Sequence, residues 1–147
     1  MGRYVVVMIK QDIYLKNWDW HVIVYYAVDT YYMDEILDEL YDMGCSHIDE
    51  IEQYLTVNPY NNGLTFSNTK DRNSLIIIGL TETPDEFQNT YDHEKGHLAM
   101  HIAEEDNMDV FGEEFQYLVG EIGKQTFRVA RKFLCEHCRR ELKENFL

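Results

Sequence analysis

The sequence predicts an α+β fold, with a small, mainly antiparallel sheet from the first half of the chain and a helical second half. Two observations predict it. Short runs rich in valine, isoleucine and tyrosine lie before residue 81, as in strands. After residue 83 the chain predicts long helices, the first of which begins with the capping sequence Thr83-Pro84-Asp85-Glu86. Because the two kinds of segment are separated along the chain, the α+β class is favoured. A length of 147 residues fits one domain, residues 1–147.

Three runs in the first half have the composition of β-strands. They extend from Val5 to Ile9, from Trp20 to Val28 and from Ser74 to Leu80. The last run is almost entirely apolar, so we expect it to be buried rather than at a sheet edge. The segments Lys16 to Asp19 and Asn58 to Gly63 predict turns.

Two short helices are expected between these strands. From Asp34 to Met43 the apolar residues follow helical spacing, and Gly44 ends the run as a helix C-cap would. Ser46 is the expected N-cap of a second helix with one apolar face. That face comprises Ile48, Ile51 and Leu55.

The second half predicts two long helices. The first starts clearly, because Thr83 offers a capping hydroxyl and Pro84 suits the first helical position. It is expected to reach about Glu105. The second extends from near Gly112 to about Glu144, with a break expected near Gly123.

The charge of the chain restricts its partners. A formal net charge of -14 argues against nucleic-acid binding, which needs a cationic surface. The short cluster Arg139 and Arg140 lies among glutamates and is interpreted as a solvated helix face. No apolar run reaches the roughly 18 residues of a membrane helix, and no signal peptide is recognised. We therefore expect a cytoplasmic protein that binds neither nucleic acid nor membranes.

The three cysteines do not predict a disulfide framework, which fits a reducing compartment. Cys135 and Cys138 have the spacing of half a structural zinc site. A complete site needs four ligands, and the sequence contains no second cysteine pair. Buried or free thiols are the favoured interpretation.

The segment His93-Glu94-Lys95-Gly96-His97 predicts a metal site. Residues four apart lie on one face of a helix, about 6 Å apart along its axis, so His93 and His97 can bind one Zn²⁺. Glu94 projects to the same side, where it can accept a proton from a metal-bound water.

A catalytic zinc usually has three protein ligands. His101 lies about 12 Å from His93 along a straight helix, which is too far to share one ion. Glu104 fails for the same reason. The remaining candidates are Glu113 and Glu114, which begin the next helix and can face the imidazoles if that helix returns antiparallel.

Residues 86–104, followed by residues 112–118, resemble small zincin-like metallopeptidases encoded by bacterial phages and mobile elements. Residues 62–68 and 74–79 resemble the same group. The resemblance implies a zincin-like active-site helix followed by a long C-terminal helix. It also implies the gluzincin ligand set, in which Glu113 is favoured over Glu114 by its place in the family's segment around the third ligand.

These observations predict a zinc metallopeptidase with one Zn²⁺ per chain and a peptide or protein substrate. Glu94 is the expected general base, and Tyr117, one turn beyond Glu113, is a candidate donor to the developing oxyanion. A non-catalytic metal-binding or protein-interaction module on the same scaffold is the alternative. Hydrolysis of non-peptide amides by the same chemistry is a third possibility.

Overall fold

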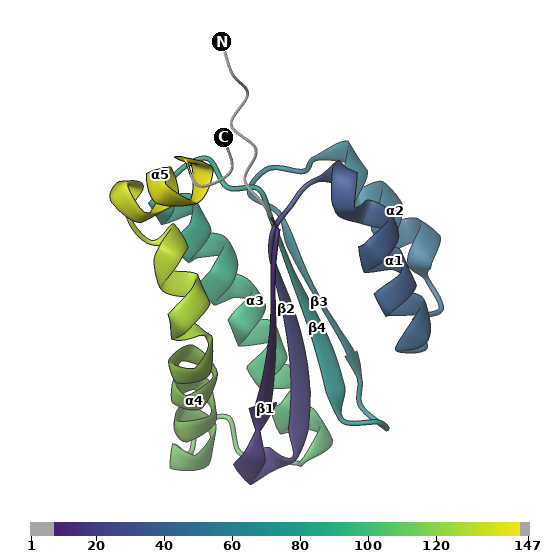
Figure 1. Ribbon diagram of the computed structural model, residues 1–147. Coiled ribbons are helices and arrows are strands. Elements are labelled where there is room, and N and C mark those ends of the chain that lie inside the picture. Colours follow the sequence, from purple (N-terminus) through teal and green to yellow (C-terminus); the bar gives the residue numbers. More distant parts are fainter. Residues whose placement is uncertain (1–7, 145–147) are drawn as a thin grey trace.

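A four-stranded sheet forms the middle layer of the protein, with helices on both of its faces (Figure 1). The computed structural model describes residues 8–144. Helices α1 (Met33–Asp42) and α2 (Ile48–Val57) cover one face. Helices α3 (Pro84–Glu105) and α4 (Glu113–Ala130) cover the other. The α+β prediction is confirmed.

The sheet is mixed rather than purely antiparallel. Its strands are β1 (Ile9–Leu15), β2 (Trp20–Val28), β3 (Gly63–Asn68) and β4 (Asn73–Gly79), in the spatial order β1-β2-β4-β3. The pairs β1–β2 and β3–β4 are antiparallel, whereas β2 and β4 are parallel. The parallel pair exists because the chain leaves β2, forms α1 and α2 over one face, and returns through β3.

Strand β1 lies later in the chain than predicted. The expected strand from Val5 to Ile9 overlaps it only at Ile9, and residues 5–7 lie outside the described part of the chain. The strand is hard to recognise in the sequence because a polar residue, the buried Gln11, occupies a core-facing position. Its amide accepts a hydrogen bond from the Tyr26 hydroxyl at 2.8 Å and donates one to the Gln125 carbonyl at 3.1 Å.

Strand β3 is absent from the sequence prediction. It pairs only with β4, so it forms one edge of the sheet and β1 forms the other. Leu64 and Phe66 pack toward α1 and α2. Thr65 and Ser67 face the opposite way and make hydrogen bonds to α3. This alternation places small polar side chains beneath α3.

The helices begin largely as predicted. The Thr83 hydroxyl caps α3 by accepting a hydrogen bond from the Glu86 amide at 3.3 Å. The predicted N-cap Ser46 is wrong, because α2 is preceded by His47 and has no side-chain cap.

The predicted break near Gly123 is also wrong. Glycine costs a helix interior only about 1 kcal/mol, and the fully buried Ile122 and Thr126 anchor α4 on either side of it. The chain breaks instead at the 3₁₀ turn Arg131–Phe133, before α5 (Glu136–Glu144).

Two hydrophobic cores lie on opposite faces of the sheet. On β4, Ile76 and Ile78 belong to the core under α3 and α4, while Leu75 and Ile77 belong to the core under α1 and α2. The run from Ser74 to Leu80, predicted as a buried strand, therefore contributes side chains to both cores. Its central place in the sheet confirms that it is not an edge strand.

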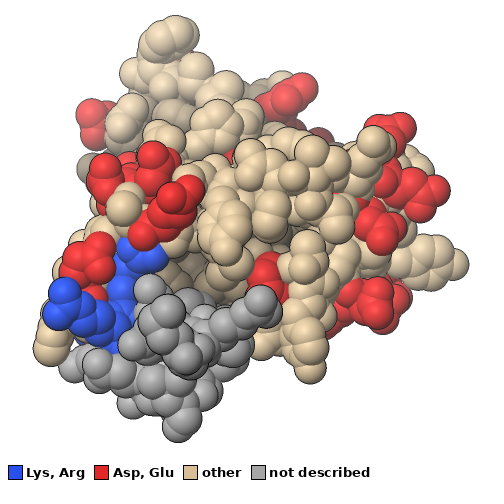
Figure 2. All heavy atoms as spheres, turned by 90° about the horizontal axis from the view of Figure 1, so that it is seen from above, with Lys and Arg blue, Asp and Glu red and all other residues tan. Residues whose placement is uncertain are grey.

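Acidic side chains are spread over the face seen in Figure 2, whereas the basic ones gather on the side where α5 lies. Arg139 belongs to this region but is not part of a solvated face, so that interpretation is wrong for it. The residue is 8% exposed, and its side chain donates hydrogen bonds to the carbonyl oxygens of Thr81 and Glu82. Among residues 8–144, no helix has the length and apolar character needed to cross a membrane.

Candidate functional site

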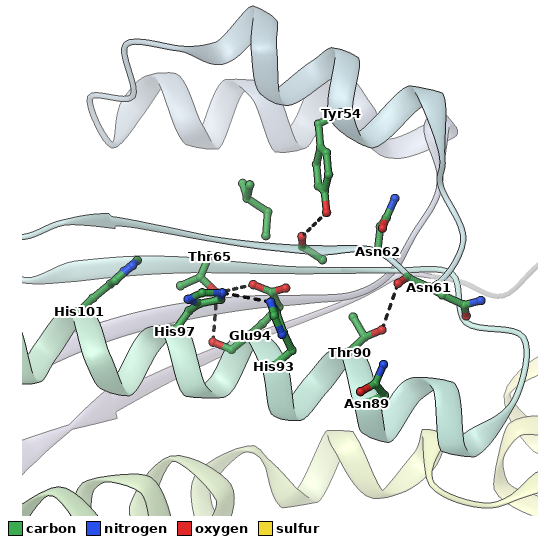
Figure 3. A pocket seen from close by; sticks show the side chains of 12 residues that line it. Tyr54, Asn61, Asn62, Thr65, Asn89, Thr90, His93, Glu94, His97 and His101 are labelled. Carbon is green, nitrogen blue, oxygen red and sulfur yellow. Dashed lines mark hydrogen bonds between the residues drawn. The ribbon is translucent and has the colours of Figure 1, made fainter. Parts of the chain in front are cut away.

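An open cavity of about 530 Å³ lies between strand β3, the middle of α3 and the C-terminal half of α2 (Figure 3). His93, Glu94 and His97 from α3 line it, together with Thr65 from β3 and Tyr54 from α2. The sequence-predicted histidine pair and its neighbouring glutamate are therefore brought together. Their cavity lies at the β3 edge of the sheet.

The two imidazoles point toward one another from successive turns of α3. Their Nε2 atoms are 3.1 Å apart, with ring centroids 4.7 Å apart and ring planes inclined at 79°. Two nitrogens bound to one tetrahedral zinc at about 2.0–2.1 Å are about 3.3–3.4 Å apart. The observed separation is close to this value, so the pair fits two positions of a zinc site.

Glu94 lies beside this pair and is nearly inaccessible, with 5% of its surface exposed. The Thr65 hydroxyl is 3.0 Å from its Oε1 atom and 3.1 Å from its carbonyl oxygen. Burial raises the pKa of Glu94, while the Thr65 hydrogen bond and the nearby His93 and His97 oppose the rise. A carboxyl with a raised pKa suits proton transfer near neutral pH.

Gly63 allows the strand to approach Glu94 closely. A Cβ atom at this position would lie 2.7 Å from Glu94 Cγ and 3.0 Å from the carbonyl oxygen of Ile77. The backbone oxygen cannot rotate away, so any larger residue must displace β3 or the carboxyl group. The absence of a side chain at Gly63 is thus part of how Glu94 is positioned.

We expect Gly63→Ala to destabilise the fold by about 1–3 kcal/mol, as overpacked sites do. Gly96→Ala is the matched control. A Cβ at Gly96 would meet nothing within 4 Å, and alanine favours a helix interior by about 0.8–1.0 kcal/mol. Urea unfolding followed by circular dichroism measures both. Equal stability of the two variants would contradict the close approach of β3 to Glu94.

The structure does not bring Glu113 or Glu114 to the imidazoles. Both are exposed at the start of α4, and no residue of this fully described helix lines the cavity. Figure 3 shows α3 between the cavity and α4. Helix α4 instead packs near β1, where Gln125 donates a hydrogen bond to the Tyr14 carbonyl at 3.1 Å. Since β1 and β3 are opposite edges, about 14 Å of sheet separates them.

The pairing of the two helices gives a second reason. The hydroxyls of Tyr91 and Thr126 form a hydrogen bond, so these residues lie at the same level of the antiparallel pair. Glu113 is 13 residues before Thr126, which is about 20 Å along α4, whereas His97 is only about 9 Å from Tyr91. About 11 Å of axial distance therefore separates Glu113 from His97. The described residues contain no group of three His, Cys, Asp or Glu side chains arranged to hold a metal.

Tyr117 is also absent from the cavity. It is 69% exposed on α4, whereas Tyr54 of α2 lies across the cavity from the histidines. The Tyr54 hydroxyl donates a hydrogen bond to the Gly63 carbonyl at 3.3 Å. Sequence reasoning missed Tyr54, Gly63 and Thr65. Gly63 and Thr65 lie on β3, a strand with only two apolar residues, and no local pattern shows that Tyr54 of α2 lies beside it.

Comparisons of the chain with protein-family models, curated proteins and solved structures gave no match.

Proposed function

We propose that this protein is a zinc-dependent hydrolase that cleaves peptide bonds. One observation carries the proposal: two imidazole Nε2 atoms 3.1 Å apart lie beside a nearly buried carboxyl group in an open cavity. A pure metal-binding site has no need of the carboxyl group at that place. A hydrolase needs it as the base that takes a proton from the attacking water.

His93 and His97 would hold the zinc ion through Nε2. Bound zinc supplies Lewis acidity toward the substrate carbonyl and lowers the pKa of water. Glu94 accepts the proton of the attacking water and then donates it to the leaving amine. The Thr65 hydroxyl, 3.0 Å from Glu94 Oε1, holds that carboxyl group in one orientation.

The cavity suits an extended peptide chain. Strand β3 has a neighbour on one side only, and its unpaired edge borders the cavity. Main-chain groups of an edge strand can pair with an extended peptide, which is a common mode of peptide recognition. We therefore infer a peptide or an unfolded protein segment as substrate.

One observation favours a second candidate, a metal-binding module without catalysis. The side chains described do not bring a third His, Cys, Asp or Glu to the histidine pair. Two protein ligands bind zinc more weakly than the three of a usual catalytic site, so the histidine pair can bind the metal without holding it in the arrangement that hydrolysis needs. The two candidates differ in whether the zinc-loaded protein hydrolyses peptides.

The proposal is tested by incubating reduced, unfolded casein with zinc-loaded protein and with protein treated with a chelator. We expect cleavage only with zinc, detected as new peptides by mass spectrometry. Glu113→Ala and Glu114→Ala are expected to retain zinc and activity within about twofold of wild type, because both carboxylates are remote from the imidazoles. Zinc binding without cleavage would favour the metal-binding module. Loss of zinc in either glutamate variant would contradict the observed packing of α4.

A further inference from the structure

A chain of hydrogen bonds extends from the core of the protein to His101, which lines the same cavity as His93 and His97. The indole nitrogen Nε1 of Trp20 lies 2.8 Å from the Ser74 hydroxyl. The Ser74 and Ser67 hydroxyls are 2.7 Å apart, and Ser67 Oγ is 2.7 Å from His101 Nδ1. Trp20 and Ser74 are 0% and 1% exposed, so water does not compete with this chain of contacts at its inner end.

The chain has a preferred direction, because an indole N–H can only donate. The Trp20 N–H donates to Ser74, which leaves the Ser74 hydroxyl proton for Ser67. Ser67 then donates its own proton to His101 Nδ1. In the reverse direction Ser74 would accept twice, and the described residues offer no other acceptor for its proton. Every proton is used only when His101 Nδ1 is an acceptor.

An imidazole whose Nδ1 accepts carries its proton on Nε2 when it is neutral. His101 is thereby held as an N–H donor whose remaining ring nitrogen is not engaged by Ser67. Because Nδ1 accepts the Ser67 proton, this arrangement holds His101 in its neutral form. A neutral donor suits an uncharged acceptor such as a carbonyl oxygen.

The position of His101 matches the repeat of an extended peptide. His101 follows His97 by one helical turn, about 6 Å along α3, and the two ring centroids are 6.3 Å apart. In an extended chain, carbonyl groups on the same side repeat every two residues, about 6.6–6.8 Å. We propose that His101 donates an Nε2–H hydrogen bond to a main-chain carbonyl of an extended peptide, two residues from the carbonyl that is cleaved. This inference rests on the proposed hydrolase function.

The test combines a substrate series with substitution of His101. Peptides that span a cleavage site found in unfolded casein are synthesised and shortened one residue at a time from each end. The value of kcat/KM is then measured for each peptide with zinc-loaded protein. In wild type, one shortening step removes the proposed carbonyl and lowers kcat/KM by about three- to tenfold, as loss of a neutral hydrogen bond does. In His101→Phe this decrease in kcat/KM is expected to be absent. Peptides that already lack the proposed carbonyl are expected to be cleaved equally well by both proteins.

Two further variants separate recognition from general damage. His101→Gln offers an N–H donor and is expected to recover part of the step. Asn89→Ala alters the other end of the same cavity (Figure 3) and is expected to leave the His101-dependent decrease in kcat/KM unchanged. An equal loss for long and short peptides in His101→Phe, or an unchanged step, would overturn the proposal.

A readout independent of catalysis is the imidazole ¹⁵N spectrum of the full chain, which identifies the protonated nitrogen of His101. We expect the Nε2–H form, with a Nδ1–H population appearing in Ser67→Ala. If wild type cleaves no peptide, the hydrolase proposal fails, and reduced, unfolded casein itself is then added to the same sample. A shift of the His101 Nε2 signal would still support its role as a peptide donor. A Nδ1–H form, or no shift, would overturn it.

Discussion

Glu94→Gln is expected to lower the rate of peptide hydrolysis by about 10²–10⁴-fold, the usual effect of removing a general acid–base. The amide has the shape of the carboxyl group, so it can keep the contact with the Thr65 hydroxyl, 3.0 Å from Glu94 Oε1. It cannot accept the proton of water. Because Glu94 is not proposed as a metal ligand, zinc affinity is expected to remain within a few-fold of wild type. The measurements are kcat with a peptide that spans a casein cleavage site, and zinc affinity by competition with a chromophoric chelator.

Glu105→Gln provides the control for this substitution. Glu105 is the exposed last residue of α3, three turns beyond Glu94, and it does not line the cavity of the histidine pair. The same change of charge there is expected to leave kcat unchanged. Full activity of Glu94→Gln, or equal losses in both variants, would exclude Glu94 as the general base.

The second large effect concerns stability. Zinc that binds the folded protein alone, at a free concentration about 100 times its Kd, stabilises the fold by about 2.7 kcal/mol. For a chain of this size that corresponds to a rise in Tm of roughly 5–10 °C. His93→Ala and His97→Ala are each expected to abolish the rise, because each removes one of the two imidazole ligands. Differential scanning calorimetry with and without zinc measures it.

His21→Ala is the matched control among the histidines. His21 lies on β2, stacked on Tyr14 with ring centroids 4.5 Å apart, and does not line the cavity. This variant is expected to keep the full zinc-dependent rise in Tm. A rise that survives in both His93→Ala and His97→Ala would show that zinc binds elsewhere on the chain.

The local part of the site could be predicted from the sequence because helix geometry fixes it. The Thr83 cap and Pro84 at the first helical position place the start of α3, and the interval of four residues then places His93 and His97 on one face. No information about the rest of the fold is needed for this step. The same holds for the central apolar strand β4, whose composition alone indicates burial on both faces.

The third ligand could not be predicted in the same way, because it depends on where a second helix packs. The expectation for Glu113 assumed that α4 returns along the cavity side of α3. Hydrogen bonds from Gln11 and Gln125 instead tie α4 to β1, at the far edge of the sheet. These contacts join residues more than 100 positions apart, and no local sequence pattern predicts them.

Strand β3 shows a different limit. Its segment contains only two apolar residues, Leu64 and Phe66, and it begins with Gly63, a residue that is rare in strands. Small polar residues are needed there because the strand lies against Glu94 and His101. The residues that the site requires are therefore not the apolar residues by which a strand is recognised in a sequence.

The central claim is that His93 and His97 together hold one zinc ion. Its most direct test is the number of zinc ions per chain, measured by native mass spectrometry on the purified protein after zinc loading and removal of excess metal. We predict one zinc per chain in wild type and in Glu94→Gln, and none in His93→Ala or His97→Ala. Zinc-free wild type, or one zinc per chain retained in both histidine variants, would contradict the claim.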